Sequence, residues 1–142
     1  MRLHIITVGA PKLTYARLGW DEYLQRLAHF HAVRVTQIAD KHNDAEHILA
    51  AAAKTTLVAL VIEGTQFSSP RLANFLEKRA LEGREVSFIV GGPNGLPAQV
   101  IAQATYTWSL SDLTFPHDLA MVVLLETLYR ASTINSGQPY HK

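Results

Sequence analysis

Apolar runs alternate with segments of helical spacing along the whole chain. Strand character, either fully apolar or alternating, is found in residues 3–8, 32–38, 57–62, 86–90 and 106–110. Apolar residues recur at helical spacing in residues 13–29, 44–54, 69–81, 97–104 and 117–134. Strands that alternate with helices predict an α/β domain with a mostly parallel sheet flanked by helices.

Two of the predicted strands, LVALVI at residues 57–62 and SFIV at residues 87–90, are apolar on both faces. Such strands belong in the centre of a sheet that helices cover on each side. Ligands of these sheets bind outside the carboxyl ends of the strands. The strand at residues 57–62 is predicted to end at Glu63 and Gly64. One rim of the sheet should therefore be formed by Glu63, Gly64 and the segments 91–95 and 110–115.

The composition is that of a folded domain. The 142 residues predict a single domain, 1–142, with 48% hydrophobic and 18% charged residues. Without cysteine, the chain has no disulfide framework, thiolate metal site or cysteine nucleophile, which agrees with a cytoplasmic protein. No apolar run is long enough to span a membrane, and the N-terminal segment lacks the features of a signal peptide.

Charge is unevenly distributed. The net charge of +1 is unlike that of a nonspecific nucleic-acid binder. Of the 13 lysines and arginines, all except Arg130 and Lys142 lie within residues 1–84. A contact with a polyanion would therefore draw mostly on the N-terminal part of the chain.

The sequence GGPNG at residues 91–95 follows a strand, as nucleotide-binding loops do. It is not a Walker loop, because no lysine follows and Pro93 removes an N–H donor. It also lacks the glycine spacing of a dinucleotide-binding loop. Two interpretations stay open: a tight turn, or a loop whose bare backbone lets a flat, non-phosphate ligand approach.

A second loop, residues 109–117, mixes small hydroxyl side chains with apolar ones. This mixture is typical of a ligand-binding wall. The alternative is a capping segment for the last helix, with Asp112 or Thr114 as the cap.

The last predicted helix is apolar around most of its circumference. Its apolar residues are Leu119, Met121, Val122, Val123, Leu124, Leu125 and Leu128. Such a helix needs two covers, and a second copy of the chain would supply one in a homodimer. The alternative cover is the N-terminal helix. Glu126 and Arg130 have the spacing of a helical ion pair.

The tail, GQPYHK, ends in an aromatic, an imidazole and a cationic residue. These groups suit an RNA base and its backbone, whereas the alternative is a frayed end. We predict no metal site, because the remaining histidines lack ligand spacing and His42 and His47 would not share a helix face. No serine lies in a nucleophile elbow.

These motifs together resemble the RlmH family. The resemblance rests on GGPNGL after an apolar strand, W-S-L-S-x-L-T-F-P-H, L-E-T-L-Y-R-A in the last helix, and the terminal P-Y-H-K. Members are SPOUT-class methyltransferases that modify N3 of a pseudouridine in 23S ribosomal RNA. The resemblance implies a SPOUT-type α/β fold whose C-terminal segment forms a deep trefoil knot, an exception to the rule against knots.

The resemblance also implies S-adenosylmethionine as cofactor, a homodimer through the last helix, and action on 23S ribosomal RNA within the ribosome. Its cofactor wall falls on Leu60, Gly91, Leu110, Ser111, Asp112, Leu113, Thr114 and Phe115. Its catalytic residues fall on Arg130, Tyr140 and His141, and its RNA contacts on these three, His117 and Lys142. A Cβ at Gly91 is expected to crowd the cofactor.

Two positions depart from the family pattern. Met121 stands where members often carry an arginine, and Gln138 replaces a histidine of some members. Neither lies in the cofactor loops, but both concern RNA contact. A methyltransferase acting on another RNA, such as a tRNA, and a non-catalytic RNA-binding dimer are the alternative functions.

Overall fold

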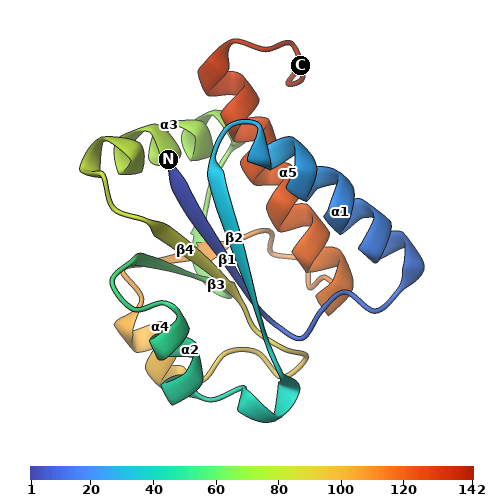
Figure 1. Ribbon diagram of the computed structural model, residues 1–142, viewed down its shortest axis with the longest axis vertical. Helices are drawn as coiled ribbons and strands as arrows, with labels where there is room; N and C mark the ends of the chain where they lie inside the picture. The colour runs from blue at the N-terminus through green and yellow to red at the C-terminus, as the bar shows by residue number, and fades with distance from the viewer.

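The computed structural model describes residues 1–142 and contains a five-stranded sheet between two layers of helices (Figure 1). The strands are β1 (Arg2–Val8), β2 (Ala32–Ile38), β3 (Thr56–Gln66), β4 (Val86–Val90) and β5 (Tyr106–Ser109). The helices are α1 (Thr14–Ala28), α2 (Ala45–Ala51), α3 (Ser69–Glu82), α4 (Ala98–Gln103) and α5 (His117–Ser136), with a 3-10 turn, η1 (Asp40–His42). The strand order is β2-β1-β4-β3-β5, and every pair is parallel, which confirms the predicted fold class.

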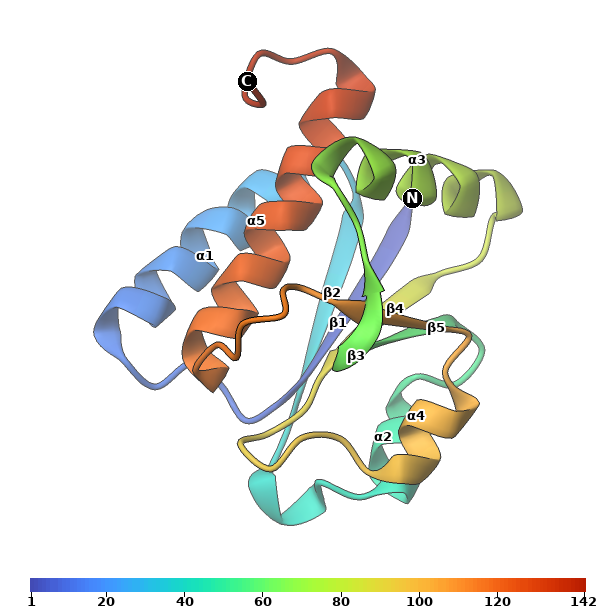
Figure 2. The same ribbon diagram turned by 180° about the vertical axis from the view of Figure 1, so that it is seen from behind.

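Successive residues along the strands point to opposite faces of the sheet and contribute to two apolar cores. Leu3 and Ile5 of β1 pack under α1, α3 and α5, whereas Ile6 and Val8 face α2 and α4. β4 is buried at every position, because it lies in the middle of the sheet with helices on both faces (Figures 1 and 2). No helix is both long and apolar enough to cross a membrane.

α5 lies between α1 and α3 on one face of the sheet (Figure 2). Its core-facing side chains are fully buried, and no residue from Leu119 to Ile134 is exposed. The N-terminal helix is therefore one cover of the last helix, as the alternative interpretation had it. The apolar circumference of α5 does not by itself require a second chain, and the homodimer stays a prediction.

β3 is longer than expected. The pair Glu63-Gly64 was predicted to end the strand, but β3 continues to Gln66. Its register with β5 shifts between Leu60 and Thr65, so that both of these residues pair with Trp108. A Cβ on Gly64 would lie 2.7 Å from the backbone nitrogen of Trp108, so this glycine permits a close crossing rather than a stop.

Capping explains the other boundary differences. Leu13 was assigned to the apolar face of the first helix, but it precedes α1 and its side chain is exposed. Ser68 caps α3 by accepting the Arg71 N–H. Asp44 caps α2 by accepting the His47 N–H. The chain leaves the edge strand β5 and returns to the middle of the sheet in α5, a path compatible with the knot, which stays a prediction.

Candidate functional site

A cavity of about 390 Å³ opens at the carboxyl ends of β3, β4 and β5. Three segments enclose it, and they are the end of β3, the glycine loop after β4 and the loop between β5 and α5. This is the rim expected from parallel-strand topology, and the volume suits a small organic ligand. The loops after β4 and β5 run along the same edge of the molecule (Figure 2).

The predicted cofactor residues line this cavity, with one exception. Those in its wall are Leu60, Gly91, Leu110, Ser111, Leu113, Thr114 and Phe115. Asp112 does not line it, because its side chain is exposed and its carboxylate accepts a 2.7 Å hydrogen bond from the Gln66 amide. The placement of Asp112 in the wall is therefore corrected.

Gly91 is required by its own loop. A Cβ at Gly91 would lie 2.7 Å from the carbonyl carbon of Gly95 and 2.8 Å from its oxygen. Gly92 and Gly95 form a bridge, and the Gly95 N–H donates to the Gly92 carbonyl at 2.9 Å. A side chain at Gly91 would thus disturb the closure of this loop, and the expectation that it would also crowd the cofactor stays a prediction.

Ser111 organises the loop between β5 and α5. Its backbone carbonyl accepts from the Ser109 hydroxyl at 2.9 Å, and its own hydroxyl accepts from the Leu113 N–H at 3.0 Å. Neither Asp112 nor Thr114 caps α5, whose N-cap position is Pro116. The capping interpretation of this loop was wrong, and its hydroxyl groups instead set the shape of a cavity wall.

The start of α5 is tied to the end of β1. His117 Nε2 donates to the Val8 carbonyl oxygen at 2.9 Å, and the Asp118 carboxylate accepts the N–H groups of Lys12 and Leu13 at 2.8 and 2.7 Å. His117, assigned by resemblance to RNA contact, lies in the cavity wall beside Ala120. Because the Leu13 N–H donates to the Asp118 carboxylate, Leu13 is held in the segment before α1 and does not belong to the apolar face of that helix.

The chemistry of the lining excludes a phosphate site. No lysine or arginine is present, Glu63 is the only carboxylate, and 11 of the 20 lining residues are hydrophobic. Apolar walls with hydroxyl and backbone groups suit a ring system carrying polar ends. Sequence reasoning missed Ile62, Leu96 and Ile101, for which only the length of β3 and the path of the following loop could have given a signal.

The tail is folded back against α1 and α5. Glu126 Oε1 accepts from Arg130 Nη2 at 2.8 Å and from the Tyr140 hydroxyl at 3.2 Å. The Tyr140 oxygen lies 3.2 Å from the Tyr23 hydroxyl. Arg130 Cζ lies 4.7 Å from the centre of the Tyr140 ring, and Arg130 Nη1 lies 3.3 Å from His141 Nδ1. The structure thus brings Arg130, Tyr140 and His141 together, whereas Lys142 is exposed.

Protonation states in this cluster follow from its contacts. Burial, the Tyr23 hydroxyl and the Glu126 carboxylate raise the pKa of Tyr140, so it remains a hydrogen-bond donor at neutral pH. The hydrogen bond to Glu126 raises the pKa of Arg130, which stays cationic. The tail therefore presents a fixed cation beside an imidazole and a protonated phenol.

The cavity and the tail cluster lie at opposite ends of α5. His117 and Ala120 line the cavity, and Arg130 follows ten residues after Ala120, about 15 Å along the helix axis. Figures 1 and 2 show the C-terminus at the end of α5 that points away from the cavity loops. Within one chain, the predicted cofactor wall and the predicted catalytic residues are not brought together.

His42 and His47 do not share a helix face, as predicted, but their side chains meet. The two rings stack with centroids 4.1 Å apart, because His42 lies in η1 and not on the helix of His47. Asp44 joins them, and candidate ligand atoms of the three residues lie within 4.8 Å of one another. However, His47 Nδ1 is already engaged by the Asp44 carboxylate at 2.8 Å.

Comparison with known proteins identifies the family. The family described as "Predicted SPOUT methyltransferase" matches residues 1–141. Ribosomal RNA large subunit methyltransferase H of Deinococcus radiodurans is 52% identical, with 100% of this chain and 99% of that protein covered. The protein of the same name from Deinococcus deserti is 51% identical, and both chains are covered completely. The chain belongs to the RlmH family of SPOUT methyltransferases.

A solved structure shows the same fold at low identity. A probable methylase family protein from Haemophilus influenzae Rd KW20 superposes with a TM-score of 0.59 at 13% identity, covering 99% of this chain and 70% of that one. SPOUT methyltransferases use S-adenosylmethionine, and the partly apolar cavity at the strand ends, with one carboxylate in its lining, suits its adenosine and amino-acid parts.

Proposed function

We propose that this protein methylates N3 of a pseudouridine in 23S ribosomal RNA, using S-adenosylmethionine and acting on the assembled ribosome in the cytoplasm. One observation carries the proposal: a cavity built by the three predicted loops in a chain that is 52% identical, end to end, to a protein named a large-subunit ribosomal RNA methyltransferase. The low net charge supports a preformed site on the ribosome over free RNA, for which phosphate contacts supply much of the affinity.

The cofactor would be held by the glycine loop, the end of β3 and residues 109–115. When bound, it supplies a methyl group on a positively charged sulfur. Leu60, Leu110 and Phe115 would exclude water from its rings, and Glu63 would place a negative charge near its cationic parts. The task of this site is to hold the reacting atoms in line.

The tail would act on the RNA base. The N3–H of a pseudouridine is weakly acidic, so its removal is helped by a base and a positive field. We assign the uptake of this proton to His141, because an imidazole nitrogen can act as a general base. Arg130 would stabilise negative charge on the carbonyl oxygens of the base next to N3. Tyr140 would position Arg130, because the Tyr140 ring lies against the guanidinium group and the Tyr140 hydroxyl donates to Glu126.

A homodimer would reunite the two halves of the site. Cavity and tail are separated by the length of α5 in one chain, so the tail of a second, oppositely directed copy would complete each cavity. Exposed large apolar side chains support this arrangement, because all except Leu81 of α3 lie toward the cavity end of the molecule. Those at this end are Leu13, Tyr15 and Leu18 before and within α1, and Ile62 and Leu113 at the cavity rim.

The proposed function is tested on the RNA directly. Ribosomes, naked 23S RNA and tRNA from cells lacking the protein are incubated with labelled S-adenosylmethionine, and the product is mapped by mass spectrometry. We expect one methylated pseudouridine in the large subunit, formed on ribosomes. Methylation of tRNA alone would favour the first alternative, and binding without methyl transfer would favour the non-catalytic RNA-binding dimer.

The cavity is tested by filling it. Thr114→Trp places an indole at the rim of the cavity, and we expect S-adenosylmethionine affinity to fall at least about tenfold by calorimetry. Asp112→Trp is the matched control, because Asp112 lies in the same loop but outside the wall. Equal affinities for the two variants would remove this cavity as the cofactor site. Gly91→Val is a poorer test, since it disturbs its own loop.

A further inference from the structure

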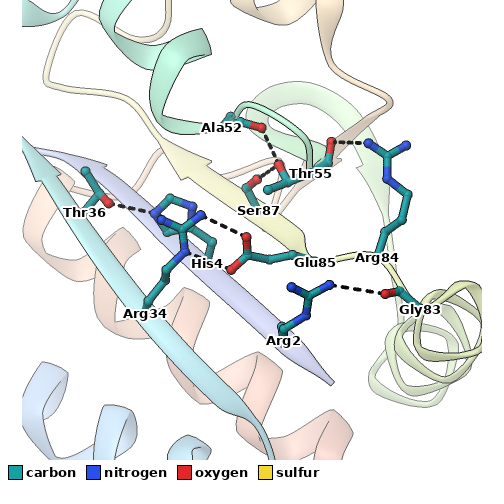
Figure 3. Close-up of polar contacts among 10 residues, drawn as sticks. All are labelled: Arg2, His4, Arg34, Thr36, Ala52, Thr55, Gly83, Arg84, Glu85 and Ser87. Atoms are coloured by element: carbon teal, nitrogen blue, oxygen red, sulfur yellow. Dashed lines mark hydrogen bonds and ion pairs between the residues drawn. The ribbon is translucent and has the colours of Figure 1, made fainter.

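Three arginines lie near one another at the amino-terminal edge of the sheet. Arg2 and Arg34 lie beside the Glu85 carboxylate, whereas Arg84 precedes Glu85 and its side chain is directed to the Thr55 carbonyl (Figure 3). We call Arg2, Arg34, Arg84 and Glu85 the arginine patch. All three arginines are exposed. Their charges exceed that of Glu85 by two, whereas the whole chain has a net charge of +1. The positive charge of this protein is therefore concentrated here.

Only one of these guanidinium groups is paired. Arg34 makes two hydrogen bonds of 2.9 Å to the Glu85 carboxylate. Arg2 and Arg84 contact only backbone carbonyls, those of Gly83 at 3.4 Å and Thr55 at 3.5 Å. Their remaining N–H donors are available to an anion, and guanidinium groups match the oxygens of a phosphate.

The charge states of Glu85 and His4 in and beneath the patch follow from their contacts. Arg34, His4 and Arg2 lower the pKa of Glu85, with Arg34 contributing most, so the one carboxylate stays ionised and engaged. His4 lies beneath, buried and bonded to the Thr36 hydroxyl at 2.7 Å. Burial, followed by the charge of Arg34, lowers the pKa of His4, so it remains neutral.

The patch lies at the same end of the molecule as the tail. Arg2 follows Met1, whose amino group is 3.4 Å from His31 Nδ1, and His31 Nε2 is 2.8 Å from the Ser132 hydroxyl of α5. Ser132 is two residues after Arg130. Figures 1 and 2 both show the two chain termini at this end, away from the cavity loops.

We propose that the arginine patch binds backbone phosphates of a ribosomal RNA segment flanking the nucleotide that the tail of the same protomer engages. The inference rests on the proposed function and extends it. The tail would engage the base, while Arg2 and Arg84 hold the neighbouring strand and fix its direction. Phosphate contacts supply affinity and register without reading sequence, which is what exposed arginines provide.

The test is the double variant Arg2→Gln, Arg84→Gln, which leaves the Arg34–Glu85 pair intact. With ribosomes from cells lacking the protein, we expect KM for ribosomes to rise about tenfold or more, with kcat and S-adenosylmethionine affinity unchanged. The slope of log affinity against log salt concentration for ribosome binding should decrease in magnitude by about 1.4–1.8, the share of two phosphate contacts. The control, Arg71→Gln with Lys78→Gln, removes two exposed charges from α3 and should behave as wild type.

The outcomes separate the two proposals. If the wild-type protein methylates ribosomes and the double variant keeps its KM and salt slope, the patch is not an RNA contact. Equal losses in the α3 control would show a general effect of net charge and would also overturn the inference. If wild type transfers no methyl group to any RNA, the proposed function fails, and filter binding to ribosomes still measures the patch independently.

Discussion

At the scale of single residues, Glu126 organises the tail. One oxygen of its carboxylate accepts hydrogen bonds from both Arg130 and Tyr140. Arg130 belongs to α5, and Tyr140 lies near the end of the chain. Tyr23 of α1 completes the cluster by its contact with Tyr140. The side chains of Glu126 and Arg130 are 23% and 29% exposed, so this pair is better shielded than an ordinary surface ion pair.

We expect Glu126→Gln to release Arg130 and Tyr140 from their positions. Methyl transfer should fall at least about tenfold, because catalysis depends on the placement of these groups. Cofactor affinity, measured by calorimetry, should not change. Glu22→Gln is the control, since Glu22 makes the same i,i+4 pair with Arg26 on an exposed surface. If the two variants retain equal turnover, Glu126 has no positioning role.

His31 should make stability depend on pH. Burial, followed by the charge of the N-terminus, lowers its pKa to about 4, from an ordinary value of 6.5. The unfolded chain therefore takes up a proton between about pH 6.5 and 4 while the folded chain does not, so stability falls as pH falls through this window. His4 acts in the same direction.

This effect is measured by urea unfolding at pH 7.5 and pH 5. We expect wild type to lose about 1–2 kcal/mol at pH 5 from His31 after allowing for its partial exposure. His31→Asn should reduce the pH dependence, with the slope from His4 remaining. An unchanged pH dependence in the variant would show that His31 titrates alike in both states.

At the scale of elements, the crossing of β3 over β5 shapes the cavity. Gly64 touches the backbone of Trp108, and the shifted register places Val61, Ile62 and Glu63 in the cavity wall. An ordinary strand end at Glu63 would leave the cavity without this side. The crossing is a property of a pair of strands and depends on the absence of one Cβ.

Gly64→Ala should therefore destabilise the fold. Its methyl group would lie 2.7 Å from backbone atoms that cannot rotate away, and we expect a loss of about 2–3 kcal/mol in urea unfolding. Gly83→Ala is the comparison, because Gly83 has a left-handed φ of +75° but nothing within 4 Å of its Cβ position. We expect about 1 kcal/mol there. A smaller effect at Gly64 than at Gly83 would contradict the close crossing.

At the scale of the whole molecule, one chain holds half of the proposed active site at each end. The cavity lies at the carboxyl edge of the sheet, while the tail and the arginine patch lie at the opposite end. An oppositely directed second copy would place the RNA-facing end of one chain beside the cavity of the other. Each dimer would then have two equivalent composite sites.

Complementation tests this arrangement. Thr114→Trp lacks a working cavity but has an intact tail, and His141→Ala has the reverse. When the two variants are refolded together in equal amounts, half of the dimers should contain one copy of each. Each mixed dimer has one competent site of its two, so activity should recover to about a quarter of the wild-type value. Each variant alone is the control. No recovery, with mixed dimers confirmed by native mass spectrometry, would place tail and cavity action in the same chain.

The sequence by itself determined the elements and their class, because apolar periodicity reflects which faces are buried. It also indicated the three loops of the cavity, since parallel strands bring their carboxyl ends to one edge. The Glu126–Arg130 pair followed from helical spacing alone. These are local properties or general consequences of parallel topology.

Only the tertiary structure decided which atoms meet. Asp112 turns to Gln66, Gly91 meets Gly95, Gly64 crosses Trp108, and His42 stacks on His47. It also brought Arg2 and Arg34, which are far apart along the chain, beside Glu85. Such contacts depend on strand register and loop path, and no periodicity within the sequence records either.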